Sequence, residues 1–161
     1  MKHLAYVVLF CCSFVSSALA SPTNEEVLKA IATLEEPEKN PDALVDAAQL
    51  VMTFAEESPD VTILLSSSAS PWLIEKWNLG EEESNAVRLL LVSSYMAGSI
   101  KHQLAEGKSD KNPYYGWLLS NKMYKLIKPK WNFVSPGAEK LCKLQEQGKL
   151  EGHAAKVMKE K

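Results

Sequence analysis

Hydrophobic residues recur at helical spacing along most of the chain, and residues that favour a helix start precede most of these runs. Thr23 and Glu26 have the spacing of a capping box, and an Asn-Pro or Ser-Pro pair precedes four other runs. Asn or Ser can accept a hydrogen bond from a free N–H of the first turn, where proline loses none. The sequence therefore predicts helices over 24–36, 41–57, 71–78, 81–106, 113–128 and 136–159, the last interrupted near Gly148.

The run 81–106 differs from the others because its apolar residues between Val87 and Met96 lie nearly all the way round the helix. A helix that is apolar on all sides is buried, and Arg88 and Lys101 bracket too short a run for a membrane span. We therefore expect an all-α fold, a single compact domain of about five or six helices packed around the central helix 81–106.

Two stretches do not fit the helical pattern. Residues 61–65 contain β-branched side chains and can form a strand, although Ser58-Pro59 would equally start a short helix, so the state of 58–68 stays open. Residues 131–134 lie between two prolines and are expected to be extended. The two stretches would then pair as a minimal two-stranded ribbon, a marginal structure on its own.

Residues 1–20 have the three parts of a secretory signal peptide. Lys2 supplies the positive start, an apolar run follows, and Ala18 and Ala20 form an A-x-A cleavage site. We predict cleavage after Ala20, export to a periplasmic or secreted location, and a single helical domain over 21–161. Cys142 is then the one cysteine left, so the mature chain has no internal disulfide, which favours a bacterial source.

Charge and ligand types narrow the function. The mature chain carries 17 basic and 20 acidic residues, a net charge of −3, which argues against a nucleic-acid partner. One cysteine and two distant histidines make no zinc pattern, so we expect no metal and no cofactor. The mature chain also has no apolar run long enough for a transmembrane segment.

No catalytic motif stands out. The serines near Ser68 lack the context of a nucleophile elbow, and Cys142 lies in a helical pattern typical of a buried structural thiol. The acidic run 81–83 is explained by its place in the first turn of the longest helix, where acids face the positive end of the dipole.

One corner of the sequence gathers polar and aromatic residues where the central helix ends and the next begins. Tyr and Trp combine broad apolar faces with a polar tip, as binding surfaces do. The candidate binding residues are Lys101, His102, Gln103, Tyr114, Tyr115 and Trp117. The competing interpretation, which we favour, is that Tyr115 and Trp117 simply pack against the central helix.

Lysines alternate with apolar and aromatic residues over 122–131. Such a stretch can lie on an anionic membrane surface, but an amphipathic helix with a solvated lysine face explains it equally, and we favour the latter.

These observations predict an exported, non-enzymatic helical module that binds a protein or envelope component. The alternative is a small hydrolase or lyase acting on a cell-envelope polymer, which would require His102 in a pocket within reach of a carboxylate or Tyr. The oligomeric state and the identity of the partner stay open at this point.

Overall fold

The structure, a computed structural model, describes residues 21–160, so the predicted signal peptide lies outside the described residues. Within this range the chain is all-helical and has no strand, which confirms the predicted fold class. The elements are α1 (Asn24–Glu35), the 3-10 helix η1 (Pro41–Ala43), α2 (Leu44–Glu57), the 3-10 helix η2 (Pro71–Leu73), α3 (Glu81–Glu106), α4 (Tyr114–Trp131), α5 (Pro136–Glu146) and α6 (Leu150–Val157).

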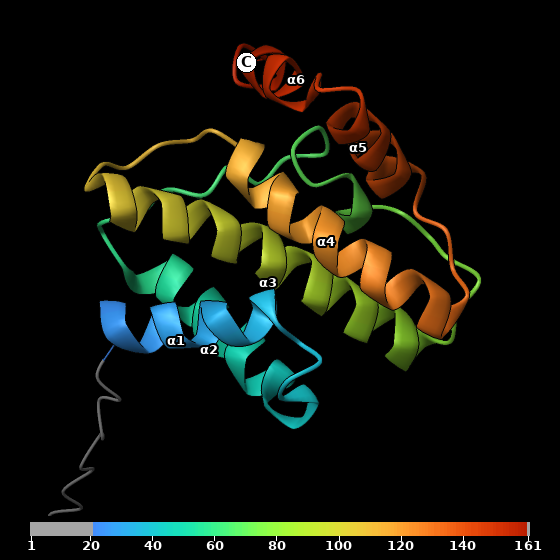
Figure 1. Ribbon diagram of the computed structural model, residues 1–161, viewed down its shortest axis with the longest axis horizontal. Helices are drawn as coiled ribbons and strands as arrows, with labels where there is room; N and C mark the ends of the chain where they lie inside the picture. Colours follow the sequence, from blue (N-terminus) through green and yellow to red (C-terminus); the bar gives the residue numbers. More distant parts are fainter. Residues whose placement is uncertain (1–20, 161) are drawn as a thin grey trace, which may run out of the picture.

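The helices form a single compact domain arranged around α3 and α4. These two run side by side and antiparallel through the middle, with α1 and α2 on one side and α5 and α6 on the other (Figure 1). Every residue of α3 from Leu91 to Ile100 is buried, so the prediction of a central buried helix is confirmed.

The closest contact between α3 and α4 is made through two glycines. A Cβ atom on Gly98 would lie 2.3 Å from the backbone oxygen of Tyr115, and one on Gly116 would lie 2.5 Å from the ring of Tyr95. Both distances are far inside van der Waals contact, so only glycine allows the two backbones to approach this closely. The contact fixes the position of Tyr115 on α4 relative to α3.

The predicted helix starts are formed in different ways. Thr23 and Glu26 make the predicted capping box, and Ser135 Oγ accepts a hydrogen bond from Ala138 N at 3.2 Å. Asn40 and Ser70 make no capping hydrogen bond, and each precedes a 3-10 helix. The predicted helix 71–78 was therefore too long, because only its first turn forms.

The predicted two-stranded ribbon does not form among residues 21–160, where no strand occurs. Trp131 belongs to the last turn of α4, which continues through Pro129, since a proline near a helix end removes only one backbone hydrogen bond. Residues 61–65 follow an irregular path, neither strand nor helix, because backbone groups of Thr62 and Leu64 hydrogen-bond to side chains of α3. Thr62, for example, bonds to Gln103.

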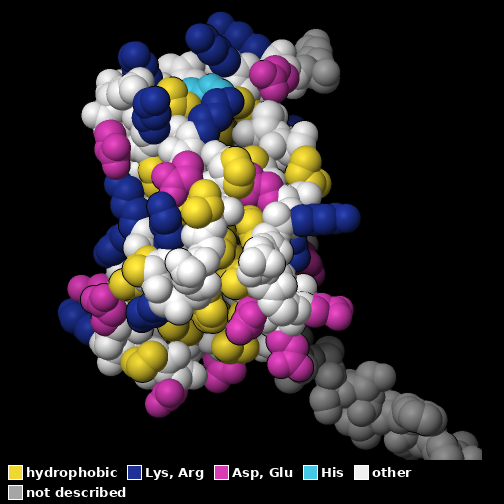
Figure 2. Space-filling model, turned by 90° about the vertical axis from the view of Figure 1, so that its right-hand side faces the viewer, with side chains coloured by type: hydrophobic (Ala, Val, Ile, Leu, Met, Phe, Trp, Pro, Cys, Tyr) yellow, Lys and Arg dark blue, Asp and Glu magenta, His cyan; other side chains and the backbone are white. Residues whose placement is uncertain are grey.

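Charge is divided unevenly along the chain. Residues 21–121 carry 7 basic and 16 acidic side chains, a net of −9, whereas residues 122–161 carry 10 basic and 4 acidic ones, a net of +6. On the face drawn in Figure 2, Lys side chains predominate in the upper part and acidic side chains in the lower part. The helices α4 to α6 therefore form a basic side opposite the acidic α1–α2 side.

Among residues 21–160, no helix combines the length and the apolar character that crossing a membrane requires.

Candidate functional site

Helical geometry distributes the predicted corner residues over different faces of α3 and α4. Successive residues of an α-helix point about 100° apart, so three consecutive residues cannot all face one surface. Lys101 is exposed, His102 is half-buried and Gln103 is buried, although they follow one another on α3. On α4, Tyr115 is half-buried whereas Trp117 is fully buried. The structure therefore brings only part of the predicted set to one surface.

The aromatic centre of this surface is a stack of two rings from different helices. The ring of His102 lies over the ring of Tyr115, with centroids 3.6 Å apart and planes within 15°. Tyr114 meets Tyr115 edge to face at 5.1 Å. The stack lines an open groove of about 370 Å³, whose apolar wall includes Leu118 and Leu119 of α4. We call it the α1–α3–α4 groove.

Charged residues close the rim of this groove at the end of α1. The Glu35 carboxylate accepts hydrogen bonds from Lys101 Nζ at 2.6 and 2.8 Å. Lys122 Nζ donates to the backbone oxygen of Glu35 at 2.5 Å, which caps the last turn of α1. A second hollow of about 470 Å³ shares Glu35 and Lys122 with the groove and extends along α4 to Leu126.

Gln103 lies in the interior and is fully bonded to the protein. Its Oε1 accepts hydrogen bonds from the backbone N–H groups of Thr62 and Asp110 at 2.8 and 3.0 Å. Its Nε2 donates to the backbone oxygens of Thr62 and Ser99 at 3.0 and 3.3 Å. With 2% of its surface exposed, Gln103 connects two loops to α3 and has no free group for a ligand.

Trp117 also faces inward. Its Nε1 donates to the backbone oxygen of Ala69 at 2.6 Å, and its ring stacks on His153 of α6 with centroids 5.3 Å apart. For Trp117 the structure has the packing arrangement that the sequence suggested as the alternative to a binding role. Tyr115 differs, because half-burial leaves part of its ring on the groove.

The groove offers shape, aromatic surface and positive charge. Within residues 21–160, neither ring nitrogen of His102 hydrogen-bonds to a carboxylate or a Tyr hydroxyl, and the ring contacts Tyr115 by its face. The same range contains no group of three His, Cys, Asp or Glu side chains placed to hold a metal ion.

Several groove residues were missed by the sequence analysis. Leu118 and Lys122 follow Tyr115 at i+3 and i+7, so helical spacing alone could have placed them on its face. Glu35 carries no such signal, because it is 66 residues away from its partner Lys101. Only the packing of α1 on α3 brings it to the rim.

In comparisons with protein-family models, curated proteins and solved structures, no match to this chain was found.

Proposed function

We propose that this chain is an exported, non-enzymatic helical module that binds a protein or another envelope component through the α1–α3–α4 groove. The observation that carries this proposal is the His102–Tyr115 stack, which presents aromatic surface beside the apolar side chain of Leu118 in an open groove. Partly exposed aromatic and aliphatic surface in a concave site is typical of binding hot spots.

The charges of the groove indicate the kind of segment that fits it. Lys101 and Lys122 stand on the rim, while the wall between them is apolar. An apolar segment that carries a carboxylate at one end would fill the wall and meet Lys122, which forms no ion pair within residues 21–160, whereas Lys101 is paired with Glu35. The enzymatic alternative receives no support from the orientation of His102, so we do not propose it.

A photo-crosslinking side chain placed at position 118 in the exported protein tests this proposal. We expect one defined adduct from position 118 and none from position 45, because Val45 is 52% exposed on α2, away from the groove. The variant His102→Ala should reduce the adduct severalfold without unfolding the chain. Equal labelling from both positions, or an adduct unaffected by His102→Ala, would contradict binding at the groove.

Export is tested separately by the N-terminal sequence of the protein recovered outside the cytoplasm. We expect the exported form to begin at Ser21. Recovery of an intact Met1 in that fraction would contradict cleavage while leaving the groove proposal standing.

A further inference from the structure

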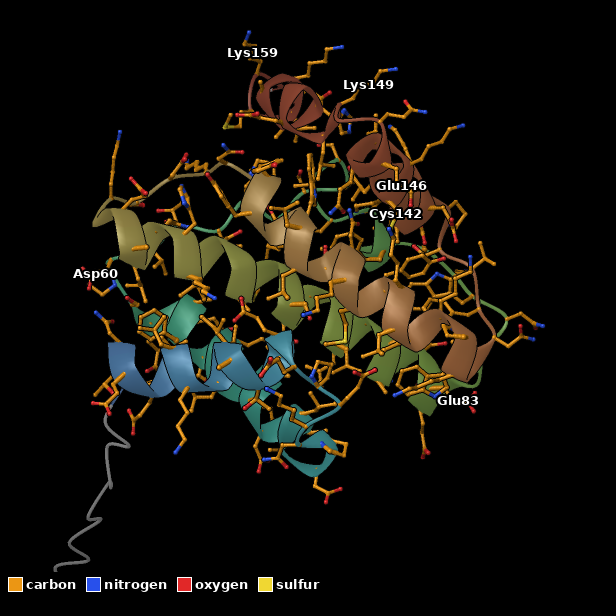
Figure 3. The ribbon with its side chains drawn as sticks, viewed as in Figure 1. Asp60, Glu83, Cys142, Glu146, Lys149 and Lys159 are labelled. Carbon is orange, nitrogen blue, oxygen red and sulfur yellow. The ribbon has the colours of Figure 1, made fainter. Side chains whose placement is uncertain are left out.

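Another groove lies between α4 and α5 and shares no lining residue with the α1–α3–α4 groove. It has a volume of about 540 Å³ and is lined by four lysines from the two helices, Lys125, Lys128, Lys140 and Lys143. Cys142, which is 5% exposed, also lines it, and Figure 3 shows Cys142 and Glu146 on the side of α5 that faces α4. We call this the α4–α5 groove.

Only two of these four lysines are neutralised by neighbouring carboxylates. Lys125 pairs with Glu146 at 3.0 Å, and Lys128 pairs with Glu139. Lys140 and Lys143 are exposed and form no ion pair within residues 21–160. A concave surface lined with an excess of one charge concentrates its field, so the groove attracts anions.

Two exposed apolar side chains lie in the loops beside the start of α5. Val134, in the loop between α4 and α5, is 58% exposed, and Ile74 is 73% exposed. The two loops are joined, because the Glu75 carboxylate accepts hydrogen bonds from Ser135 Oγ at 2.5 Å and Gly137 N at 2.7 Å. The two apolar tips therefore lie near the start of α5, the helix that carries Lys140 and Lys143.

We propose that this surface, formed by the α4–α5 groove and the tips Ile74 and Val134, docks the protein on an anionic phospholipid bilayer. Lysine ammonium groups meet the lipid phosphates, while the two apolar side chains enter the interface between headgroups and acyl chains. The proposal goes beyond the binding of a partner in the α1–α3–α4 groove and rests on other residues.

The details of the surface favour a lipid bilayer over a soluble polyanion. The positive groups that line the α4–α5 groove are lysines, which act as point charges, and its lining includes no arginine to grip a single phosphate with a planar fork. Exposed Ile and Val side chains gain nothing from a polyanion in water, but they lose water on entering a bilayer interface. The acidic first turn of α3 points elsewhere, since Glu83 lies on the lower side in Figure 3, away from α5.

The structure also limits how α4 takes part. Its apolar residues Met123 and Ile127 are buried in the core, so α4 cannot insert an apolar face of its own. The solvated lysine face predicted for residues 122–131 is therefore present, and only the neighbouring loops supply exposed apolar side chains.

Flotation of the mature protein with vesicles tests the proposal. We expect binding to phosphatidylcholine vesicles that contain about a third phosphatidylglycerol, and none to phosphatidylcholine alone. Each lysine near an anionic surface strengthens binding about fivefold, so Lys140→Gln with Lys143→Gln should weaken it roughly thirtyfold. The matched control, Lys108→Gln with Lys111→Gln, removes the same charge from the α3–α4 loop at the far end and should bind almost as the unchanged chain does.

A third variant, Ile74→Ser with Val134→Ser, separates docking from simple charge attraction. Because both side chains are exposed, the variant should keep its melting temperature and lose about tenfold in vesicle binding. The docking surface would be overturned if the groove variant, Lys140→Gln with Lys143→Gln, and its control lost the same amount of vesicle binding. Unchanged vesicle binding of the variant with two serines would overturn it too. Tighter binding to soluble inorganic polyphosphate than to the anionic vesicles would overturn the bilayer as its target.

Discussion

The two contacts of α4 are built on different principles. Against α3, α4 approaches so closely that Gly98 lies on the backbone of Tyr115, and the contact has no room for one more carbon atom. Against the hairpin of α5 and α6, α4 uses side-chain groups, among them the Trp117–His153 stack and a hydrogen bond from Asn121 Nδ2 to Gln145 Oε1 at 2.8 Å.

This difference separates a rigid part of the molecule from an adjustable one. Backbone contacts between packed helices do not depend on pH or salt, because no ionised group takes part. Contacts through carboxylates, lysines and a histidine do depend on both. The wall that α3 and α4 give to the α1–α3–α4 groove rests on the rigid contact, whereas the α4–α5 groove lies beside the adjustable one.

The largest effect is expected from Gly98→Ala. The added Cβ would lie 2.3 Å from the Tyr115 oxygen, and backbone atoms cannot move aside, so unfolding should become easier by about 3 kcal/mol or more. The measurement is a urea melt. The matched control is Gly152→Ala in α6, where the new methyl meets open space and should add about 0.5–1 kcal/mol. A loss below about 1 kcal/mol for Gly98→Ala would show that the helices can separate freely.

A smaller and more local effect is expected from Glu75→Ala. This change removes the acceptor for Trp77 Nε1, Ser135 Oγ and Gly137 N, so we expect a loss of about 2 kcal/mol. Amide hydrogen exchange should accelerate in α5 and remain slow in α3. Glu57→Ala, at an exposed position that ends α2, serves as the control. Equal acceleration in α3 and α5 would contradict the division into two parts.

The smallest effect concerns pH and His153. Burial lowers the pKa of His153 from its ordinary value of 6.5, and Lys140 and Lys156 add to this. The unfolded chain then binds its proton more readily, so this contribution to stability is complete above about pH 6.5 and is lost as the pH falls. Melting temperatures of the unchanged chain should fall more steeply between about pH 7 and 5.5 than those of His153→Gln. Parallel curves, or an imidazole NMR titration centred above 6.5, would contradict this assignment.

Much of the fold could be predicted from the sequence because the signals are local. The central helix was predicted with the bounds that the structure shows, Glu81–Glu106, since an acidic first turn and a polar loop flank an apolar run. The break near Gly148 was also predicted, and this glycine has a positive φ of 66° between α5 and α6. The segment 61–65 was not predictable, because its path depends on side chains of α3 that are distant in sequence.

The candidate site was only partly predictable for the same reason. The sequence indicated the corner that holds His102 and Tyr115, and the structure stacks their rings. Gln103 and Trp117 were also candidates, although packing was favoured for Trp117, and the fold directs both side chains inward to backbone groups of Thr62 and Ala69. Which way a polar side chain turns on a mostly buried helix depends on loops that come from elsewhere in the chain.

Gln103 has a consequence for which substitutions the chain tolerates. Its amide joins the segment around Thr62 to the loop at Asp110 through main-chain atoms of both. These bonds use main-chain atoms and so do not depend on the side chains at 62 and 110, although the Thr62 hydroxyl also bonds to Ser109 Oγ at 2.6 Å. They do depend on the side chain at position 103, since glutamate would set a carboxylate against the Thr62 carbonyl where an amide donor is required. The Gln103 amide thus supplies main-chain hydrogen bonds of the kind that a neighbouring β-strand supplies in a sheet, and it holds two loops to α3.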